Sequence, residues 1–340
     1  MRGGRIIAVE GGIAALVSEG RLDDLLIDGP EGEGPRAEEI HRVRIRRALP
    51  RQGGAVAKMA GGAEGFLREA PEAEEGALVL AEVTGWAEPG KAVPLSGRRL
   101  HRGRLAILTP LAQGVNVARG LKNREERARL EEAGRAALAD APYGLILRTA
   151  AEGAGEAEIA EEVARLLARE AEASAGGPPG LAAAAPSAAE RAKRDWAADE
   201  VDDGPGVFDR LGIWEALAAL RRPRADLGRG AWMAVEPTAA FVAVDVNTGA
   251  DVSADAAARA NLAAAADLPR QLRLRGLGGV IIVDFAPMRK ADRKAVESAL
   301  SRALAADPVQ TVLAGWTPLG HLELQRKRER RPTAPLIPDV

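Results

Sequence analysis

The most informative stretch of the sequence is FVAVDVNTG, residues 241–249. Asp245 and Asn247 stand at odd positions, and the even positions between and before them are apolar: Val242, Val244 and Val246. Successive side chains of a strand point to opposite faces of its sheet. The alternation therefore predicts a strand with one packed face and one face that carries oxygen ligands.

A second stretch, GGVIIVDF (residues 278–285), is apolar at odd and even positions alike until Asp284. This pattern predicts a central strand that is buried on both faces and ends in a carboxylate. Residues with helical character separate the two strands, so a strand–helix–strand crossover would bring Asp245 and Asp284 together. Two carboxylates in a low-dielectric cleft repel each other unless a cation lies between them. Mg²⁺ prefers oxygen ligands and is commonly held by one or two carboxylates. The alternative is that each aspartate only caps the following helix.

Composition limits the remaining possibilities. The chain has 340 residues, enough for two or three domains, and a formal net charge of −2, so a polyanion site would need a local concentration of arginine. It has no cysteine, which excludes disulfides, thiolate nucleophiles and zinc sites built on cysteine. Its histidines, His41, His101 and His321, are scattered. Neither a signal peptide nor a membrane-spanning run is present, so we expect a soluble cytoplasmic protein.

The rest of the chain reads as several small subdomains of mixed α and β structure. The expected elements are a strand meander over 5–27, a small barrel over 40–100, a strand at 144–149 between helices at 125–139 and 156–170, a linker over 174–186, helix over 207–220, and alternating strands and helices from 230.

Two basic segments are candidates for contact with phosphate. Arg270 and Arg273 would share one face of a helix that Pro269 starts or kinks. The run QRKRERR, residues 325–331, is expected to be exposed. The alternative for both is a solvated basic surface.

Two long motifs carry a family resemblance. GAWMAVEPTAAFVAVDVNTG (residues 230–249), followed by NLAAAADLPRQLRLRGLGGVIIVDFAPM (261–288), is similar to the catalytic core of the bacterial ribonuclease E/G family. The resemblance implies a Mg²⁺-dependent endoribonuclease that cleaves single-stranded RNA with metal-activated water, leaves a 5′-phosphate and a 3′-hydroxyl, and acts in RNA processing or decay. Asp245, Asn247 and Asp284 match the family's catalytic magnesium site, with the two aspartates as metal ligands.

The resemblance also implies a domain plan. Residues 1–39 with 182–228 would form an RNase H-like part, reduced because the linker-rich segment 174–206 is short. Residues 40–100 would form an inserted OB-fold, 101–173 a region that senses the RNA 5′ end, and 229–331 a DNase I-like α/β catalytic domain.

Individual RNA contacts follow from the same resemblance. Five residues match the pocket for the 5′-monophosphate of RNA: Gly103, Ile107, Arg119, Arg148 and Thr149. Arginine offers a fork of donors for phosphate and threonine a hydroxyl. Phe66 matches a base-stacking aromatic of the OB-fold, but the second such position holds Val56, which leaves a thinner stacking platform.

Some family features are absent. Pro287 replaces an acidic residue common after the second aspartate, and without cysteine no zinc and no zinc-linked oligomer is expected. Two alternative functions stay open. One is a non-catalytic RNA-binding protein derived from the same fold, and the other is an unrelated Mg²⁺ phosphohydrolase of small nucleotides.

Overall fold

The computed structural model describes residues 4–30, 34–70, 72–88, 90–253 and 255–338. The chain forms two compact units, one made of Met1–Pro30 with Trp196–Val340 and the other of Glu31–Asp195. Each unit has its own hydrophobic cores. Among the described residues, no helix is both long and apolar enough to span a bilayer.

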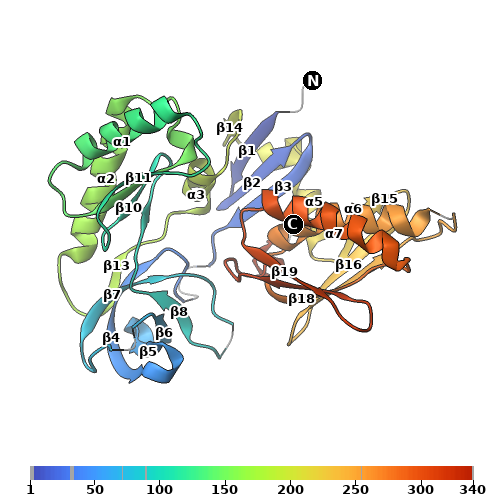
Figure 1. The fold of residues 1–340 in the computed structure, drawn as a ribbon, viewed down its shortest axis with the longest axis horizontal. Helices are drawn as coiled ribbons and strands as arrows, with labels where there is room; N and C mark the ends of the chain where they lie inside the picture. The colour runs from blue at the N-terminus through green and yellow to red at the C-terminus, as the bar shows by residue number, and fades with distance from the viewer. Residues whose placement is uncertain (1–3, 31–33, 71, 89, 254, 339–340) are drawn as a thin grey trace. The chain divides into compact units, whose positions relative to one another are not determined.

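A closed five-stranded barrel forms one half of the second unit (Figure 1). Its strands, in order around the barrel, are β4 (Ile40–Leu49), β5 (Gly54–Lys58), β6 (Glu64–Arg68), β8 (Val93–Ser96) and β7 (Leu78–Val83). Pairing between β4 and β7 closes the ring, which confirms the barrel expected over 40–100.

Part of the expected linker over 174–186 is ordered, so that prediction was wrong. β13 (Gly180–Ala183) pairs with β4 of the barrel, and α3 (Ala188–Asp195) follows it. The sequence of β13, GLAA, has small side chains and no alternation, so its pairing with β4 rather than its own pattern makes it a strand.

The other half of the second unit is a four-stranded sheet with two helices packed on it (Figure 1). The strands, in sheet order, are β11 (Gly114–Val117), β12 (Gly144–Leu147), β10 (Ala106–Thr109) and β9 (His101–Arg102). The helices are α1 (Arg124–Leu138) and α2 (Glu156–Ser174), as the periodicity predicted. The Asn123 side chain caps α1 by accepting from two backbone N–H groups of its first turn.

The first unit begins with the predicted meander. β1 (Arg5–Glu10), β2 (Ile13–Ser18) and β3 (Arg21–Ile27) are antiparallel, and β14 (Glu200–Asp202) adds to β1 in parallel. Two short helices pack on this sheet, α4 (Val207–Arg210) and α5 (Ile213–Leu220). They replace the single helix expected over 207–220, because Gly212 takes a left-handed conformation between them.

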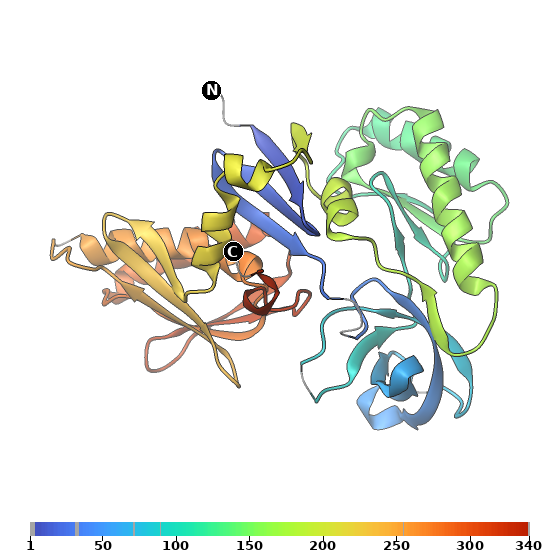
Figure 2. The same cartoon turned by 180° about the vertical axis from the view of Figure 1, so that it is seen from behind.

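A six-stranded sheet with helices on one face completes the first unit (Figure 2). In sheet order its strands are β15 (Arg224–Gly228), β16 (Ala231–Pro237), β17 (Val242–Asn247), β18 (Gly279–Asp284), β20 (Leu322–Arg326) and β19 (Thr311–Trp316). β17 and β18 are parallel, joined by α6 (Ala256–Leu274), and α7 (Lys290–Ala306) lies beside α6. Pro269 lies inside α6 instead of starting it.

The two-sided burial expected for β18 was wrong. Ile281 and Val283 are buried beneath the helices, but Val280 is 40% exposed and the side chain of Asp284 is 60% exposed. An apolar run shows that a strand is central, but it cannot show that only one face is covered. The opposite face of the sheet, which we call the open face, therefore carries the polar residues of both β17 and β18.

Candidate functional site

The two predicted carboxylates lie side by side. Asp245 of β17 and Asp284 of β18 are paired positions of the parallel ladder, and Val244 pairs with Val283 in the row before them. The valines point into the core under α6, so both aspartates point to the open face. Neighbouring strands are separated by roughly 4.8 Å. Both side chains therefore share one patch of the open face, as the strand–helix–strand pattern predicted.

Asn247 adjoins this pair. Its Nδ2 donates a hydrogen bond of 2.5 Å to Oδ2 of Asp245, two residues earlier on the same face of β17. This bond fixes the direction of the carboxylate and uses the nitrogen of the amide. The amide Oδ1 of Asn247 is left as a further oxygen donor beside the pair.

His321 also belongs to the site, although no sequence pattern placed it there. Its Nδ1 lies 3.3 Å from Oδ1 of Asp284. The contact arises because β20 pairs antiparallel with β18, with Leu322 opposite Val283, so the residue before β20 comes next to Asp284. The Thr317 side chain accepts a hydrogen bond of 3.1 Å from the backbone N–H of His321, which holds this turn. Only the strand pairing could have revealed the contact.

The helix-capping alternative for these aspartates fails. Asp255, not Asp245, precedes α6, and Arg289, not Asp284, precedes α7. Among the described residues there is no group of three or more histidine or acidic side chains that could hold a metal. A cation at this site would thus have two carboxylates and an amide oxygen as protein donors, with water completing its shell. That donor set fits Mg²⁺, which prefers oxygen and keeps several waters.

A second cluster forms where two parallel strands of the second unit end together. β11 and β12 are parallel, so Arg119, just beyond β11, and Thr149, just beyond β12, lie at the same sheet edge. The Oγ1 of Thr149 is 3.3 Å from where a Cβ on Gly120 would lie, which places its hydroxyl against the Arg119 loop. Arg119 and Thr149 are both exposed.

Arg148 links this edge to Gly103. Its Nη1 donates 2.6 Å to the Gly103 carbonyl, and its Nη2 contacts the Asp195 carboxylate at 3.0 Å. Ile107 lies on β10, opposite Ile146 of β12. The structure therefore joins Gly103 directly to Arg148, and it places Ile107 on the neighbouring strand of the same sheet.

Sequence reasoning missed Glu162 of α2, which shapes the Gly103 loop. Its carboxylate accepts three backbone N–H groups, those of Arg104, Leu105 and Ala106, at 3.1, 2.6 and 2.8 Å. A Cβ on Gly103 would lie 2.4 Å from Oε1 of Glu162, so this position needs glycine. On the sequence, Glu162 is one of many glutamates of an amphipathic helix, and only its bonds to the Gly103 loop distinguish it.

Phe66 and Val56 occupy paired positions of β6 and β5 on the barrel. Both are half-buried, and the Phe66 ring lies over Gly54, where a Cβ would come within 2.8 Å of Cζ. The glycine makes room for the ring against the barrel wall. Val56 adds apolar surface beside Phe66 but no second ring.

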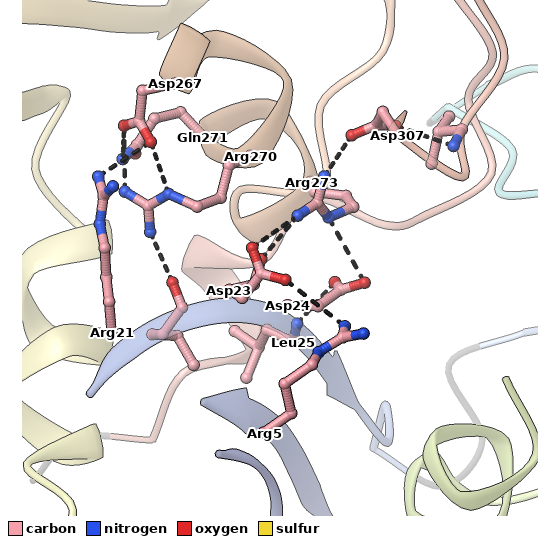
Figure 3. Close-up of polar contacts among 12 residues, drawn as sticks. Arg5, Arg21, Asp23, Asp24, Leu25, Asp267, Arg270, Gln271, Arg273 and Asp307 are labelled. Atoms are coloured by element: carbon pink, nitrogen blue, oxygen red, sulfur yellow. Dashed lines mark hydrogen bonds and ion pairs between the residues drawn. The ribbon is translucent and has the colours of Figure 1, made fainter. Parts of the chain in front are cut away.

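The two helical arginines, Arg270 and Arg273, do not form a basic surface, so that expectation was wrong. Arg270 donates to Asp267 at 2.6 Å and to the Leu22 carbonyl at 2.6 Å, and Arg273 contacts Asp307 and Asp23 (Figure 3). Their side chains are only 15% and 10% exposed. Spacing showed that they share a side of α6, but it could not show that this side faces β3.

The run 325–331 is exposed only in part, at Gln325, Lys327 and Arg328. Arg326 is 1% exposed and contacts Asp307 at 3.0 Å, and Arg330 pairs with Asp24. These arginines neutralise buried aspartates and hold the C-terminal segment against β3 and α6. Their contribution is to packing of the first unit.

A model of the family described as "Ribonuclease E/G family" matches residues 101–204 and 185–329. Ribonuclease E of Nostoc sp. is 33% identical over 305 residues, which cover 76% of this chain and 44% of the relative. Ribonuclease G of Escherichia coli K12 is 31% identical over 268 residues, covering 67% and 55%. Ribonuclease E of Synechocystis sp. is 31% identical over 296 residues, covering 74% and 43%. The chain spans about half the length of these relatives.

Proposed function

Because this chain belongs to the ribonuclease E/G family, we propose that it is an endoribonuclease of single-stranded RNA that uses Mg²⁺ held by Asp245 and Asp284. The observation that carries this proposal is the pairing of the two aspartates in the parallel ladder, on the open face and beside Asn247. Its setting would be cytoplasmic RNA processing or decay.

The finer fold assignment is part of the same proposal. The closed barrel would be the OB-fold of the family, and the six-stranded sheet its DNase I-like catalytic domain. The meander with β14, α4 and α5 would be a reduced RNase H-like part. In support, the barrel has Phe66 on its outer wall, and the aspartates lie at the C-terminal ends of adjacent parallel strands.

The proposed reaction is hydrolysis of a phosphodiester. When bound, Mg²⁺ would activate the attacking water and neutralise charge that builds up on the phosphate. Asp245 and Asp284 would hold the ion, and Asn247 would fix the orientation of Asp245 through its hydrogen bond. Water would form a bond to phosphorus as the bond to the 3′ oxygen breaks, which leaves a 5′-phosphate and a 3′-hydroxyl. The open face leaves the pair accessible to an extended strand.

The cluster at the ends of β11 and β12 is proposed to recognise the 5′-monophosphate of the RNA. Arg119 and Thr149 offer exposed donors. Arg148, next to Thr149 in the chain, is hydrogen-bonded to the carbonyl of Gly103 and so ties the Gly103 loop to this cluster. Ile107 would contribute apolar contact from β10. Phe66 would stack on a base at the barrel.

The test is cleavage of a fluorescent single-stranded oligoribonucleotide with a 5′-monophosphate. We expect Mg²⁺-dependent cleavage by the natural protein and at least a hundredfold loss in Asp245→Asn and Asp284→Asn. Asp292→Asn is the matched control, because Asp292 is an exposed partner of Arg289. Unchanged cleavage in either site variant would refute the proposal.

The non-catalytic alternative is favoured only by the single ring at the barrel wall. It predicts that the natural protein retains RNA in EDTA and gives no cleavage in Mg²⁺. Hydrolysis of mononucleotides without cleavage of RNA would instead indicate a small-nucleotide phosphohydrolase.

A further inference from the structure

A cavity of about 630 Å³ lies in the first unit among β3, α5, the edge strand β15 and α6. Four arginines line it, Arg21, Arg224, Arg270 and Arg275, with two aspartates, Asp226 and Asp267. The charged lining thus carries an excess of two positive charges. Neither proposed metal ligand lines this cavity, so it is separate from the site on the open face.

One carboxylate, that of Asp267, pairs with two of these four arginines. Asp267 accepts from Arg21 at 2.9 Å, from Arg270 at 2.6 Å and from Gln271 at 2.9 Å, and Figure 3 shows the three side chains converging on it. Among the residues that the structure describes, Asp267 forms neither a hydrogen bond nor an ion pair with Arg275. Arg21 is 58% exposed on its side chain, so the cavity opens to solvent beside it.

Arg275 is the exceptional member of the lining. It is only 6% exposed, yet within the described parts of the chain none of its hydrogen bonds goes to a carboxylate. Its Nη1 donates to the amide oxygen of Gln271, and its Nη2 donates to the carbonyls of Arg222 at 3.0 Å and Pro223 at 3.5 Å. Its buried Nε has no hydrogen-bond partner among the residues that the structure describes.

This arrangement is unfavourable for an empty cavity. Burial, and then the charge of Arg270, lower the pKa of Arg275 to about 10, and Asp267 opposes this only in part. A buried cation that lacks a counterion is costly. In contrast, the buried Arg273 and Arg326 each have an aspartate, and so does the half-buried Arg330. Arg275 thus differs from them in having no carboxylate partner among the described residues.

We propose that this cavity binds a phosphate-bearing ligand of about mononucleotide size, with Arg275 as its buried anchor and Arg21 at the entrance. A guanidinium presents a planar fork that matches two phosphate oxygens. A phosphate monoester carries close to two negative charges at neutral pH, which balances the excess of the lining. The volume lies within the usual range of small-ligand pockets. The phosphate could belong to a free nucleotide or to an RNA chain.

The test measures binding by calorimetry and by the shift of the melting temperature, in EDTA so that no cleavage contributes. The probes are inorganic phosphate, AMP, adenosine as the uncharged match of AMP, and a 5′-hydroxyl oligoribonucleotide. We expect AMP to raise the melting temperature and adenosine not to. We expect Arg275→Met to weaken AMP binding at least tenfold, with the exposed Arg289→Met as control.

Further arms decide the outcome. Arg275→Lys should keep part of the affinity for AMP. Arg21→Ala, at the solvent-exposed entrance, should weaken AMP binding severalfold. This variant replaces Arg275→Met as the test if Arg275→Met does not fold. Binding of AMP that depends on Arg275 identifies a free nucleotide as the ligand, whereas such dependence for the oligoribonucleotide alone identifies RNA phosphate. Absence of binding by the natural protein, or equal affinity in both arginine variants and the natural protein, would overturn the proposal. Because cleavage is not measured, this result is independent of the proposed nuclease activity.

Discussion

Asn247 donates its amide nitrogen to the carboxylate of Asp245 at 2.5 Å, on the face of β17 that the helices leave open. The bond is possible because residues two apart on a strand share a face. It fixes Oδ2 of Asp245 towards Asn247, beside the paired Asp284. Asn247 therefore acts mainly by setting the orientation of the Asp245 carboxylate within the pair.

Replacing Asn247 should change the orientation of the Asp245 carboxylate without changing the charge of the site. We expect Asn247→Ala to lower kcat/KM for RNA cleavage roughly tenfold to a hundredfold, corresponding to the loss of one hydrogen bond to a charged group, about 1.5–3 kcal/mol. The loss should be smaller than that of Asp245→Asn. Asn116→Ala, at an exposed position of β11, is the control. A loss equal to that of Asp245→Asn would show that Asn247 does more than orient its neighbour.

His321 should set how well Asp284 is held for the ion. Its Nδ1 is 3.3 Å from Oδ1 of Asp284. We expect His321→Leu to raise the Mg²⁺ concentration for half-maximal cleavage about threefold to tenfold, as for loss of an orienting partner of a metal ligand. Mn²⁺ binding followed by electron paramagnetic resonance should weaken in parallel. Thr317→Val, which removes the bond that holds the His321 turn, should act in the same direction but less. An unchanged Mg²⁺ dependence in His321→Leu would contradict this role.

The site illustrates what the sequence could predict. The valine–aspartate alternation of β17 placed Asp245 and Asn247 on one face, and the apolar run placed Asp284 at the end of the next parallel strand. Both are local patterns. His321 and Glu162 were missed because their contacts depend on pairing between β20 and β18 and on packing of α2 against the Gly103 loop. Such contacts join segments far apart in the chain and leave no periodic signal.

For the arginines the error was the opposite: the sequence indicated contacts with phosphate, and the structure shows ion pairs within the protein. A basic run and a pair of arginines at helical spacing are typical of surfaces that contact phosphate. Instead, the buried Arg273 and Arg326 and the half-buried Arg330 pair with Asp24 and Asp307. Charge in the sequence does not tell whether its counterion lies in solvent, in a ligand or in a distant strand. The barrel strands and the helices α1 and α2 were predictable from the sequence, because apolar alternation and periodicity are properties of each segment itself.

Gly103 should not tolerate a side chain. A Cβ there would lie 2.4 Å from Oε1 of Glu162, whose carboxylate holds three backbone N–H groups of the loop. We expect Gly103→Ala to destabilise the protein by about 1–3 kcal/mol, as in other overpacked sites, measured by urea unfolding. Gly97→Ala is the control, because nothing lies within 4 Å of its Cβ position. Equal stability of the two variants would mean that the loop moves freely away from Glu162.

Thr149 should affect the choice of RNA 5′ end more than catalysis itself. Its hydroxyl lies at the edge shared with Arg119. We expect Thr149→Val to lower the ratio of kcat/KM for 5′-monophosphorylated over 5′-hydroxylated RNA about threefold to tenfold, while cleavage of the 5′-hydroxylated substrate stays within twofold. Thr109→Val is the control, because Thr109 is the last residue of β10 in the same sheet. Equal loss on both substrates would argue against a 5′-phosphate site at this edge.

The Glu38–Arg194 pair should make the stability of the second unit depend on acid. Arg194 contacts Glu38 at 2.6 and 2.9 Å, and both side chains are largely buried. Burial alone would raise the pKa of Glu38, but the hydrogen bonds and charge of Arg194 outweigh it and hold this pKa below its usual value of 4.5. The stabilisation is therefore present above about pH 4.5 and is lost as the pH falls through the lower pKa of the folded state.

We expect Arg194→Met to cost about 3 kcal/mol at pH 7, as for a broken buried pair, measured by urea unfolding. The difference from the natural protein should shrink steadily between pH 5 and pH 3, whereas Arg289→Met, which removes an exposed pair, should show little difference at any pH. A gap between Arg194→Met and the natural protein that stays constant down to pH 3 would contradict the assignment of the lowered pKa to this pair.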